Sequence, residues 1–291
     1  MFGNETGAAA QEDLPPERRR LLAPTDRLCG ITDVGQGRDH NEDTFAIAAD
    51  GRLLIVADGM GGHAAGEVAS ALAVQIVTEF LTPERLSAID SDPASAAAVL
   101  AEASQAAQAG VLEAAAGHAE RNGMGTTVLA AYVAGDMLYT CHVGDVRGYV
   151  RSSAGLEQIT RDHSTVGVLV RSGQITREEA RVHPKKNEIL QAIGLPAGII
   201  PEINASKLSS GDRVLLCSDG LWEALSDEEI STVVDSEGSM RQRAIQLVDR
   251  ANGAGGFDNI TVVLYEHGGE TLLDSAEGCP LMFHANGLCS S

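Results

Sequence analysis

The chain has 291 residues, of which 44% are hydrophobic and 21% are charged, and this composition is that of a globular protein. Acidic residues outnumber basic ones by 41 to 21, which gives a formal net charge of −20. A field of that sign repels nucleic acids and anionic membrane surfaces and attracts divalent cations, so we expect neither nucleic acid nor membrane as a partner.

The two ends of the chain differ from its middle. Residues 1–26 are polar and contain the run Arg18–Arg20, so we expect a flexible N-terminal arm with solvated arginines. Residues 268–291 have no sustained periodicity and predict a C-terminal tail, in which the apolar residues 281–283 are able to dock. Residues 27–267 are interpreted as one domain, and we expect a monomer.

Cysteines and apolar runs indicate the compartment. The five cysteines form no CxxC pair, and Cys141 and Cys217 lie inside apolar runs. Buried reduced thiols, and hence a reducing compartment, are the simpler interpretation. No apolar run approaches the ~20 residues that span a bilayer, and the N-terminus lacks a secretory pattern, so a cytoplasmic protein is predicted.

In chain order, the first clear element is an apolar strand over residues 53–57, which ends in Asp-Gly. Apolar residues at every fourth position from Val68 to Phe80 then predict a helix with one buried face. Residues 94–116 predict a second helix, and its many alanines allow close packing.

The middle of the chain is rich in strands. Residues 125–133 and 137–143 predict a hairpin joined by Ala-Gly-Asp, and residues 148–151 and 156–160 extend it into a meander. The segment 162–194 is helical but broken by glycine and proline. We interpret this segment as a flap between strong strands.

The last third repeats the earlier pattern. Residues 212–218 predict a strand that again ends in Asp-Gly, and two helices follow near 227–235 and 239–252. Residues 260–265 predict a closing strand. Adjacent strands separated from helical stretches favour an α+β fold with antiparallel sheets and helices packed on them.

Acidic residues lie at the ends of several predicted strands. They are Asp58 and Asp219 after apolar strands, Asp258 before the last strand, Asp145 after residues 137–143, and Glu42 and Asp43 before the strand-like TFAIA. Converging carboxylates repel one another unless cations neutralise them, and Mg²⁺ and Mn²⁺ prefer oxygen ligands. Two such ions can activate a water for phosphoryl transfer. Each Asp-Gly taken alone is more often a turn, so spacing by itself favours only a possible magnesium or manganese site.

Seven short sequence segments, called strings below, occur in a fixed order and narrow the range of possible functions. They are RDHNED (38–43), VADGMGGHAAGEVAS (56–70), GMGTTVLAA (123–131), VGDVRGY (143–149), DHS (162–164), LLCSDGLW (215–222) and DNITVV (258–263). The set resembles the metal-dependent protein phosphatases (PPM, or type 2C Ser/Thr phosphatases) in their bacterial form, from about Gly30 to Tyr265. The resemblance implies a four-layer αββα sandwich of two antiparallel sheets flanked by helices. It also implies hydrolysis of phosphoserine and phosphothreonine in proteins, opposing a bacterial Ser/Thr kinase.

The same resemblance implies a centre of two Mn²⁺ or Mg²⁺ ions, with a possible third. By position, Asp58 matches the carboxylate that bridges two ions, and the carbonyl of Gly59 matches a ligand of one of them. Asp219 and Asp258 match ligands of the other, and Asp43 matches the acid of the first motif. Glu42 precedes it and is a candidate for a supporting role. Asp145 matches the ligand of a third, weaker ion near the flap.

Two further residues are implied in the reaction. Arg38 matches the arginine that binds substrate phosphate, for which a guanidinium fork is well suited. Animal members carry a histidine directly after the Asp-Gly as proposed general acid, whereas this chain has Met60 there and His63 later. His63 is therefore only a possible proton donor.

Two other classes of function compete with an active phosphatase. An inactive relative that binds phosphoproteins would be expected to lack metal ligands, yet Asp58, Asp219 and Asp258 are all present. A two-metal phosphodiesterase or nuclease is opposed by the net charge of −20 and the lack of basic stripes. The basic residues of the flap either guide a phosphorylated partner or are simply solvated.

Overall fold

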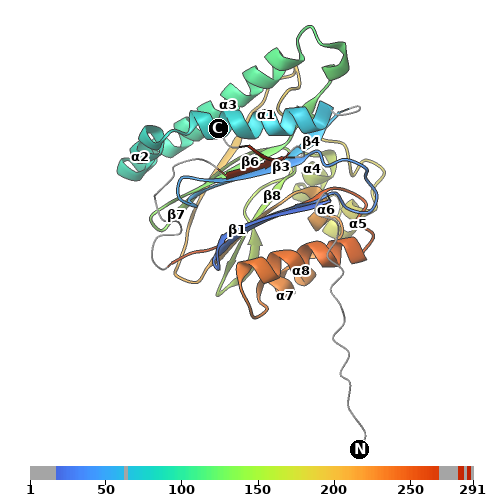
Figure 1. Ribbon diagram of the computed structural model, residues 1–291. Coiled ribbons are helices and arrows are strands. Elements are labelled where there is room, and N and C mark those ends of the chain that lie inside the picture. Colours follow the sequence, from blue (N-terminus) through green and yellow to red (C-terminus); the bar gives the residue numbers. More distant parts are fainter. Residues whose placement is uncertain (1–17, 62–64, 269–280, 285–286, 290–291) are drawn as a thin grey trace, which may run out of the picture.

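The computed structural model describes residues 18–61, 65–268, 281–284 and 287–289. In these residues two antiparallel sheets are stacked face to face, with helices on both outer faces (Figure 1). This arrangement confirms the predicted αββα sandwich. The flap, residues 162–194, lies at one end of the sandwich beside α6 (Figure 1).

The first sheet has the strand order β1-β2-β12-β11-β8-β9. Its strands are β1 (Arg19–Thr25), β2 (Leu28–Asp33), β12 (Ile260–Glu266), β11 (Arg213–Cys217), β8 (Arg147–Ser152) and β9 (Gly155–Gln158). Three helices belong to its outer side, namely α6 (Asp219–Trp222), α7 (Asp227–Val234) and α8 (Met240–Gly253). Capping boxes at Ser226 and Ser239 define the starts of α7 and α8.

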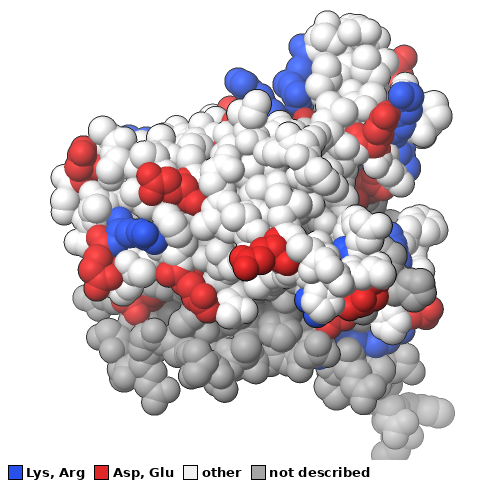
Figure 2. Space-filling view, turned by 90° about the horizontal axis from the view of Figure 1, so that it is seen from above, with Lys and Arg blue, Asp and Glu red and all other residues white. Residues whose placement is uncertain are grey.

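The second sheet has the order β10-β7-β6-β4-β3-β13-β14, and β5 pairs with β4 off this path. Its strands are β10 (Glu202–Lys207), β7 (Met137–Val143), β6 (Val128–Ala134), β4 (Leu53–Met60), β3 (Asp43–Ala48), β13 (Leu281–His284), β14 (Gly287–Cys289) and β5 (Gly125–Thr126). The helices α1 (Ala65–Phe80), α2 (Pro83–Ser91) and α3 (Ala96–Ala115) cover its outer face. Seen from that side, the surface is mostly uncharged, with acidic and basic side chains scattered over it (Figure 2).

Central strands carry runs of consecutive apolar residues because both faces of these strands are covered. In β4, Ile55 packs toward the helices while Leu54 and Val56 pack between the two sheets. Such strands read as continuous apolar runs rather than as alternating ones. This explains why residues 53–57 were visible in the sequence as a strand.

The two helices predicted over 68–80 and 94–116 are confirmed, but the predicted apolar stripe is not the most deeply buried side of the first helix. The predicted helices correspond to α1 and α3, which pack closely enough that a Cβ on Gly110 would meet Ile76 at 2.3 Å. The stripe from Val68 to Phe80 is only partly buried, whereas Ala69 and Ala73 are fully buried. The small residues therefore form the tightest contact, because large side chains would hold the helix away from its neighbours.

The predicted meander is wrong. After β7 the chain crosses to the other sheet, where β8 pairs with β11 and β9, so 148–151 and 156–160 do not extend the 125–143 hairpin. Gly144 makes this crossing possible, because its φ of +106° is costly for other residues and a Cβ there would meet Thr127 at 2.4 Å.

Strands lie near both ends of the chain. Residues 19–25 form β1, which pairs with β2, so the arm predicted over 1–26 overlaps a strand of the first sheet. Residues 281–283 dock as β13 against β3, as their apolar character allowed. Strands β2 and β10 and helix α2 were not predicted. Short 3₁₀ turns at Pro93–Ser95 and Ala119–Arg121 flank α3.

Two other sequence features have structural counterparts. Cys29, Cys141 and Cys217 are buried and unpaired, as expected of reduced thiols. Within the described ranges, no single helix is long and apolar enough to cross a bilayer. Helices α1 and α2 would be long and apolar enough only when taken together, and they are bent by 62° relative to each other.

Candidate metal centre

The sandwich brings acidic residues from distant parts of the chain to one place. Asp43 opens β3 and lies directly opposite Asp58 on β4. Asp219 follows β11 and Asp258 precedes β12, in the other sheet. The hydroxyl of Ser218 donates to a carboxylate oxygen of Asp43 at 2.7 Å, and this bond links the two sheets beside the acids.

Burial and mutual repulsion strongly disfavour charge on these groups. The pKa of Asp58 is raised well above its ordinary value by burial and then by the charges of Asp219, Asp43, Asp145 and Asp258. The pKa of Asp219 is raised in the same way. Burial also raises the pKa of Asp43 to about 7 and that of Asp145 to about 7. A cluster of this kind needs a cation to stay ionised at neutral pH.

One oxygen in the cluster lacks a partner in the protein. Oδ1 of Asp219 is buried and accepts no hydrogen bond from the described residues. Buried carboxylate oxygens are normally satisfied, so an orphaned one points to a missing ligand. With several carboxylates and a backbone carbonyl around it, the donor set is all oxygen, which fits Mg²⁺ or Mn²⁺.

Gly59 allows β4 to reach the cluster. A Cβ on Gly59 would meet the carbonyl oxygen of Gly66 at 2.1 Å and that of Glu42 at 2.6 Å. Only glycine permits this approach of β4 to the start of α1. Glu42 is occupied there, because its carboxylate accepts a backbone hydrogen bond from Gly66. Of the two adjacent acids, Asp43 is thus the one that lies in the buried cluster.

Arg38 lies at the exposed side of the cluster. Its Nη2 donates to Oδ2 of Asp258 at 2.7 Å, and about half of its side chain is exposed. Burial lowers the pKa of Arg38, but the charge of Asp258 and the hydrogen bond to it outweigh burial and raise it. The guanidinium is therefore charged and accessible beside the acids.

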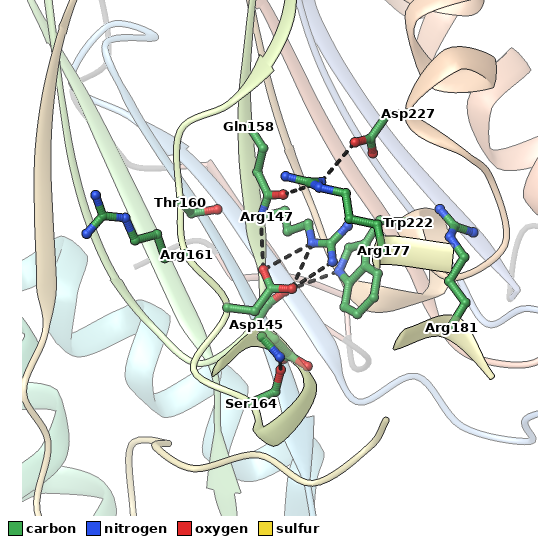
Figure 3. A network of polar contacts seen from close by, with 12 residues as sticks. Asp145, Arg147, Gln158, Thr160, Arg161, Ser164, Arg177, Arg181, Trp222 and Asp227 are labelled. Carbon is green, nitrogen blue, oxygen red and sulfur yellow. Dashed lines mark hydrogen bonds and ion pairs between the residues drawn. The ribbon is translucent and has the colours of Figure 1, made fainter. Parts of the chain in front are cut away.

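Asp145 lies on the flap side of the cluster. Its backbone oxygen accepts a hydrogen bond from Trp222 Nε1 at 3.2 Å, and the guanidinium of Arg147 stacks on the Trp222 ring at 3.7 Å (Figure 3). Arg147 also pairs with Asp162 at 2.6 Å at the start of the flap. These contacts hold Asp145 between β8, the flap and α6.

The flap itself contains α4 (Thr165–Arg171) and α5 (Arg177–Arg181). A cavity of about 660 Å³ separates it from α6 and α7. The cavity wall includes Arg177, which donates to Gln158 and Asp227 (Figure 3), and Arg181, which donates to the carbonyls of Glu223 and Leu225 just after α6. Acidic and basic side chains alternate around this space, so the predicted basic character of the flap is partly neutralised.

Three supporting residues were not predicted. Asn259 donates to the carbonyls of Val34 and His40 and accepts from the amide of Glu42, which ties the loop before β3 to β12. Ser218 holds Asp43, as described above. Thr126 donates to the carbonyl of Asp58 at 2.8 Å. All three lie inside the quoted strings, and Asn259 and Ser218 adjoin acids there, but their role depends on contacts between distant segments.

Among the histidines, only His63 was predicted as a possible proton donor. His63 lies outside the described residues. His142 and His163 are buried, and their rings stack with centroids 4.7 Å apart, on the flap side of Gly144. Burial lowers the pKa of both, and that of His163 falls to about 4. With Glu202 they form a group whose ligand atoms lie within 4.8 Å of one another.

A profile of the family described as "Protein phosphatase 2C" matches residues 35–255. The chain belongs to the protein phosphatase 2C family. The expected family resemblance is thereby confirmed.

Bacterial members of the protein phosphatase 2C family are similar over most of the chain. The serine/threonine phosphatase stp of Listeria welshimeri is 37% identical over 245 residues, which cover 81% of this chain and 93% of the relative. The structure of Stp1 from Staphylococcus aureus has a TM-score of 0.76 at 33% identity and covers 92% of this chain and all of that one. The catalytic domain of PstP, solved in complex with two manganese ions, has a TM-score of 0.69 at 35% identity and covers 86% and 98%.

Proposed function

We propose that this protein is a metal-dependent protein serine/threonine phosphatase that hydrolyses phosphoserine and phosphothreonine and opposes a bacterial Ser/Thr kinase. The observation that carries the proposal is the convergence of five aspartates from both sheets, with an orphaned oxygen on Asp219. Family membership and relatives named as serine/threonine phosphatases support it.

The chain's own residues have distinct parts in this proposal. Asp58, Asp219, Asp258, Asp43 and the carbonyl of Gly59 hold two Mn²⁺ or Mg²⁺ ions. When bound, such a pair supplies a water of lowered pKa for attack on phosphorus. The two-manganese PstP structure supports this choice of cofactor.

Asp145 provides the proposed third, weaker site. Its carboxyl is buried, and its pKa of about 7 reflects a need for a neutralising partner. It lies away from Arg38 and toward the flap, so loss of its carboxylate should affect turnover less than loss of Asp58. Glu42 has a supporting part through its bond at the start of α1.

Arg38 binds the substrate phosphate. Its guanidinium can present two donors to two phosphate oxygens, and its bond to Asp258 keeps it at the rim of the cluster. His63 stays our candidate for protonating the leaving oxygen.

We further propose that the protein is a monomer in the cytoplasm. We propose that its domain includes β1 and therefore begins before Arg19 rather than at residue 27, and that a tail follows residue 267.

A phosphothreonine peptide tests the proposal. The purified chain should release phosphate only with Mn²⁺ or Mg²⁺, and EDTA should abolish the release reversibly.

Arg38→Ala should raise KM about tenfold or more, since it removes a charged pair of donors to phosphate. Full activity in EDTA would reject metal dependence, and unchanged KM in the variant would reject the role of Arg38.

A further inference from the structure

The loop that carries Arg38 is held by its backbone at many points. It runs from the end of β2 to the start of β3. The amides of Gln36 and Gly37 both donate to the carbonyl of Gly256, at 2.7 and 2.8 Å. The amide of Gly35 donates to a carboxylate oxygen of Asp33 at 2.9 Å. The loop is thus shaped on one side by contacts from β2 and from the segment that follows α8.

Arg18 holds the same loop from the other side. Its Nη2 donates to the carbonyl of Gly35 at 2.6 Å and to the carbonyl of Arg38 itself at 3.2 Å. Its own carbonyl accepts the amide of Val34 at 2.9 Å. One guanidinium therefore bridges the first part of the loop and the residue that carries the phosphate-binding side chain.

The adjacent arginine anchors the strand from which Arg18 projects. Nε of Arg19 donates to Asp33 at 2.7 Å, and its Nη1 donates to Asp249 of α8 at 2.8 Å. Asp33 is buried and accepts the Gly35 amide with its other oxygen. Since β1 is fixed by Arg19, Arg18 is presented to the loop from a rigid base. This arrangement differs from the solvated arm expected for the arginine run.

We infer that Arg18 is a positioning residue for phosphate binding, which acts by fixing the backbone of Arg38. The inference rests on the proposed role of Arg38 in binding phosphate. A guanidinium bound to two carbonyls makes charge-assisted hydrogen bonds, which are stronger than neutral ones. Without them the loop gains conformations in which Arg38 is misplaced, and ordering it again would reduce affinity for the phosphorylated substrate.

The test is a double-mutant cycle on the manganese-loaded full chain with a phosphothreonine peptide. Arg18→Ala should raise KM about three- to tenfold and change kcat less than twofold. In an Arg38→Ala background the same substitution should have no further effect on KM, because the side chain that Arg18 positions is gone. The increase should also persist in 0.5 M NaCl, where direct attraction of the peptide by the Arg18 charge would be screened.

Arg85 provides a matched control. It lies on α2, which is at the opposite end of the sandwich from α6 and its Asp219 (Figure 1), and it also donates to a backbone carbonyl, that of Phe80 at 2.7 Å. Arg85→Ala removes one charge, one such bond and the stacking of the guanidinium on the Phe80 ring, and it should leave both KM and kcat unchanged. If Arg18→Ala lowers the thermal midpoint by more than that control does, Arg18→Gln, which keeps an amide donor, is used in the same cycle.

The outcomes separate the inference from the proposed function. If Arg38→Ala raises KM and Arg18→Ala does not, the inference is overturned and the proposed function stands. If the two effects multiply in the double variant, Arg18 acts independently of Arg38, and the inference is again overturned. If Arg38→Ala itself leaves KM unchanged, the proposed phosphate-binding role fails first.

Discussion

At the scale of single residues, the acids of the cluster oppose folding and serve function. Asp58 and Asp219 are buried among like charges, and one oxygen of Asp219 has no partner among the described residues. Such an arrangement costs stability in the protein without metal, since each carboxylate must be desolvated beside others. Stability and activity should therefore respond in opposite directions when one charge is removed.

Asp219→Asn tests this opposition. The neutral amide relieves repulsion, so the thermal midpoint in EDTA should stay equal or rise by about 2–4 °C for each kcal/mol gained. Phosphatase activity with Mn²⁺ should fall on the order of 100-fold or more, because a proposed metal ligand is lost. Differential scanning fluorimetry and a phosphopeptide assay give the two readouts.

Glu102→Gln is the control for that variant, since it removes one charge from the exposed side of α3. It should change neither the midpoint nor the activity measurably. A large drop in the midpoint of Asp219→Asn in EDTA would contradict the view of Asp219 as a destabilising buried charge.

At the scale of elements, a buried ion pair is among the contacts that join the flap to the sandwich. Arg147 on β8 and Asp162 at the start of the flap are 13% and 8% exposed, and Arg147 also stacks on Trp222. Removing one partner of a buried pair leaves the other charge uncompensated. The pair therefore sets how the flap, α6 and Asp145 are held together.

Arg147→Ala should lower the free energy of unfolding by about 3–5 kcal/mol, because Asp162 is then left buried without its partner. Urea denaturation measures the loss. The control is Arg177→Ala, which breaks the more exposed pair with Asp227 and should cost less than about 1 kcal/mol. Equal losses in the two variants would show that the burial of the Arg147 pair has no special effect.

At the scale of the whole molecule, a net charge of −20 is combined with an acidic cluster that binds protons in the absence of metal. Burial raises the pKa of Asp43 and of Asp145 from 3.8 to about 7. A raised pKa in the folded state means that the folded protein binds protons more tightly than the unfolded chain. The stability from these protons is complete below about pH 4 and is lost as pH rises through 7.

The thermal midpoint in EDTA should therefore fall between pH 6.5 and pH 8. That window lies above the range in which the buried His142 and His163, whose pKa values are lowered, take up protons. With saturating Mn²⁺ the midpoint should be higher and the fall should flatten, since the cation replaces the protons. Parallel pH profiles with and without Mn²⁺ would contradict this linkage.

Much of the fold was predictable from local pattern. The strand over 53–57 and the hairpin over 125–143 were visible because both faces of these strands are covered and most of their residues are apolar. The quoted strings also resemble those of the family that the chain belongs to. The acids of the candidate site were selected from those strings, and their roles as ligands stay predictions.

The sequence by itself determined the class of fold, the family and the set of acids, because apolar runs and short strings are local properties. Only the tertiary structure decided that β8 and β9 leave the 125–143 hairpin for the other sheet and that β1 carries Arg18 to the Arg38 loop. Pairing between distant strands depends on which surfaces meet, and no local pattern encodes it. For the same reason Arg18–Arg20 resembled a solvated run until its partners, Gly35 and Asp33, were placed beside it.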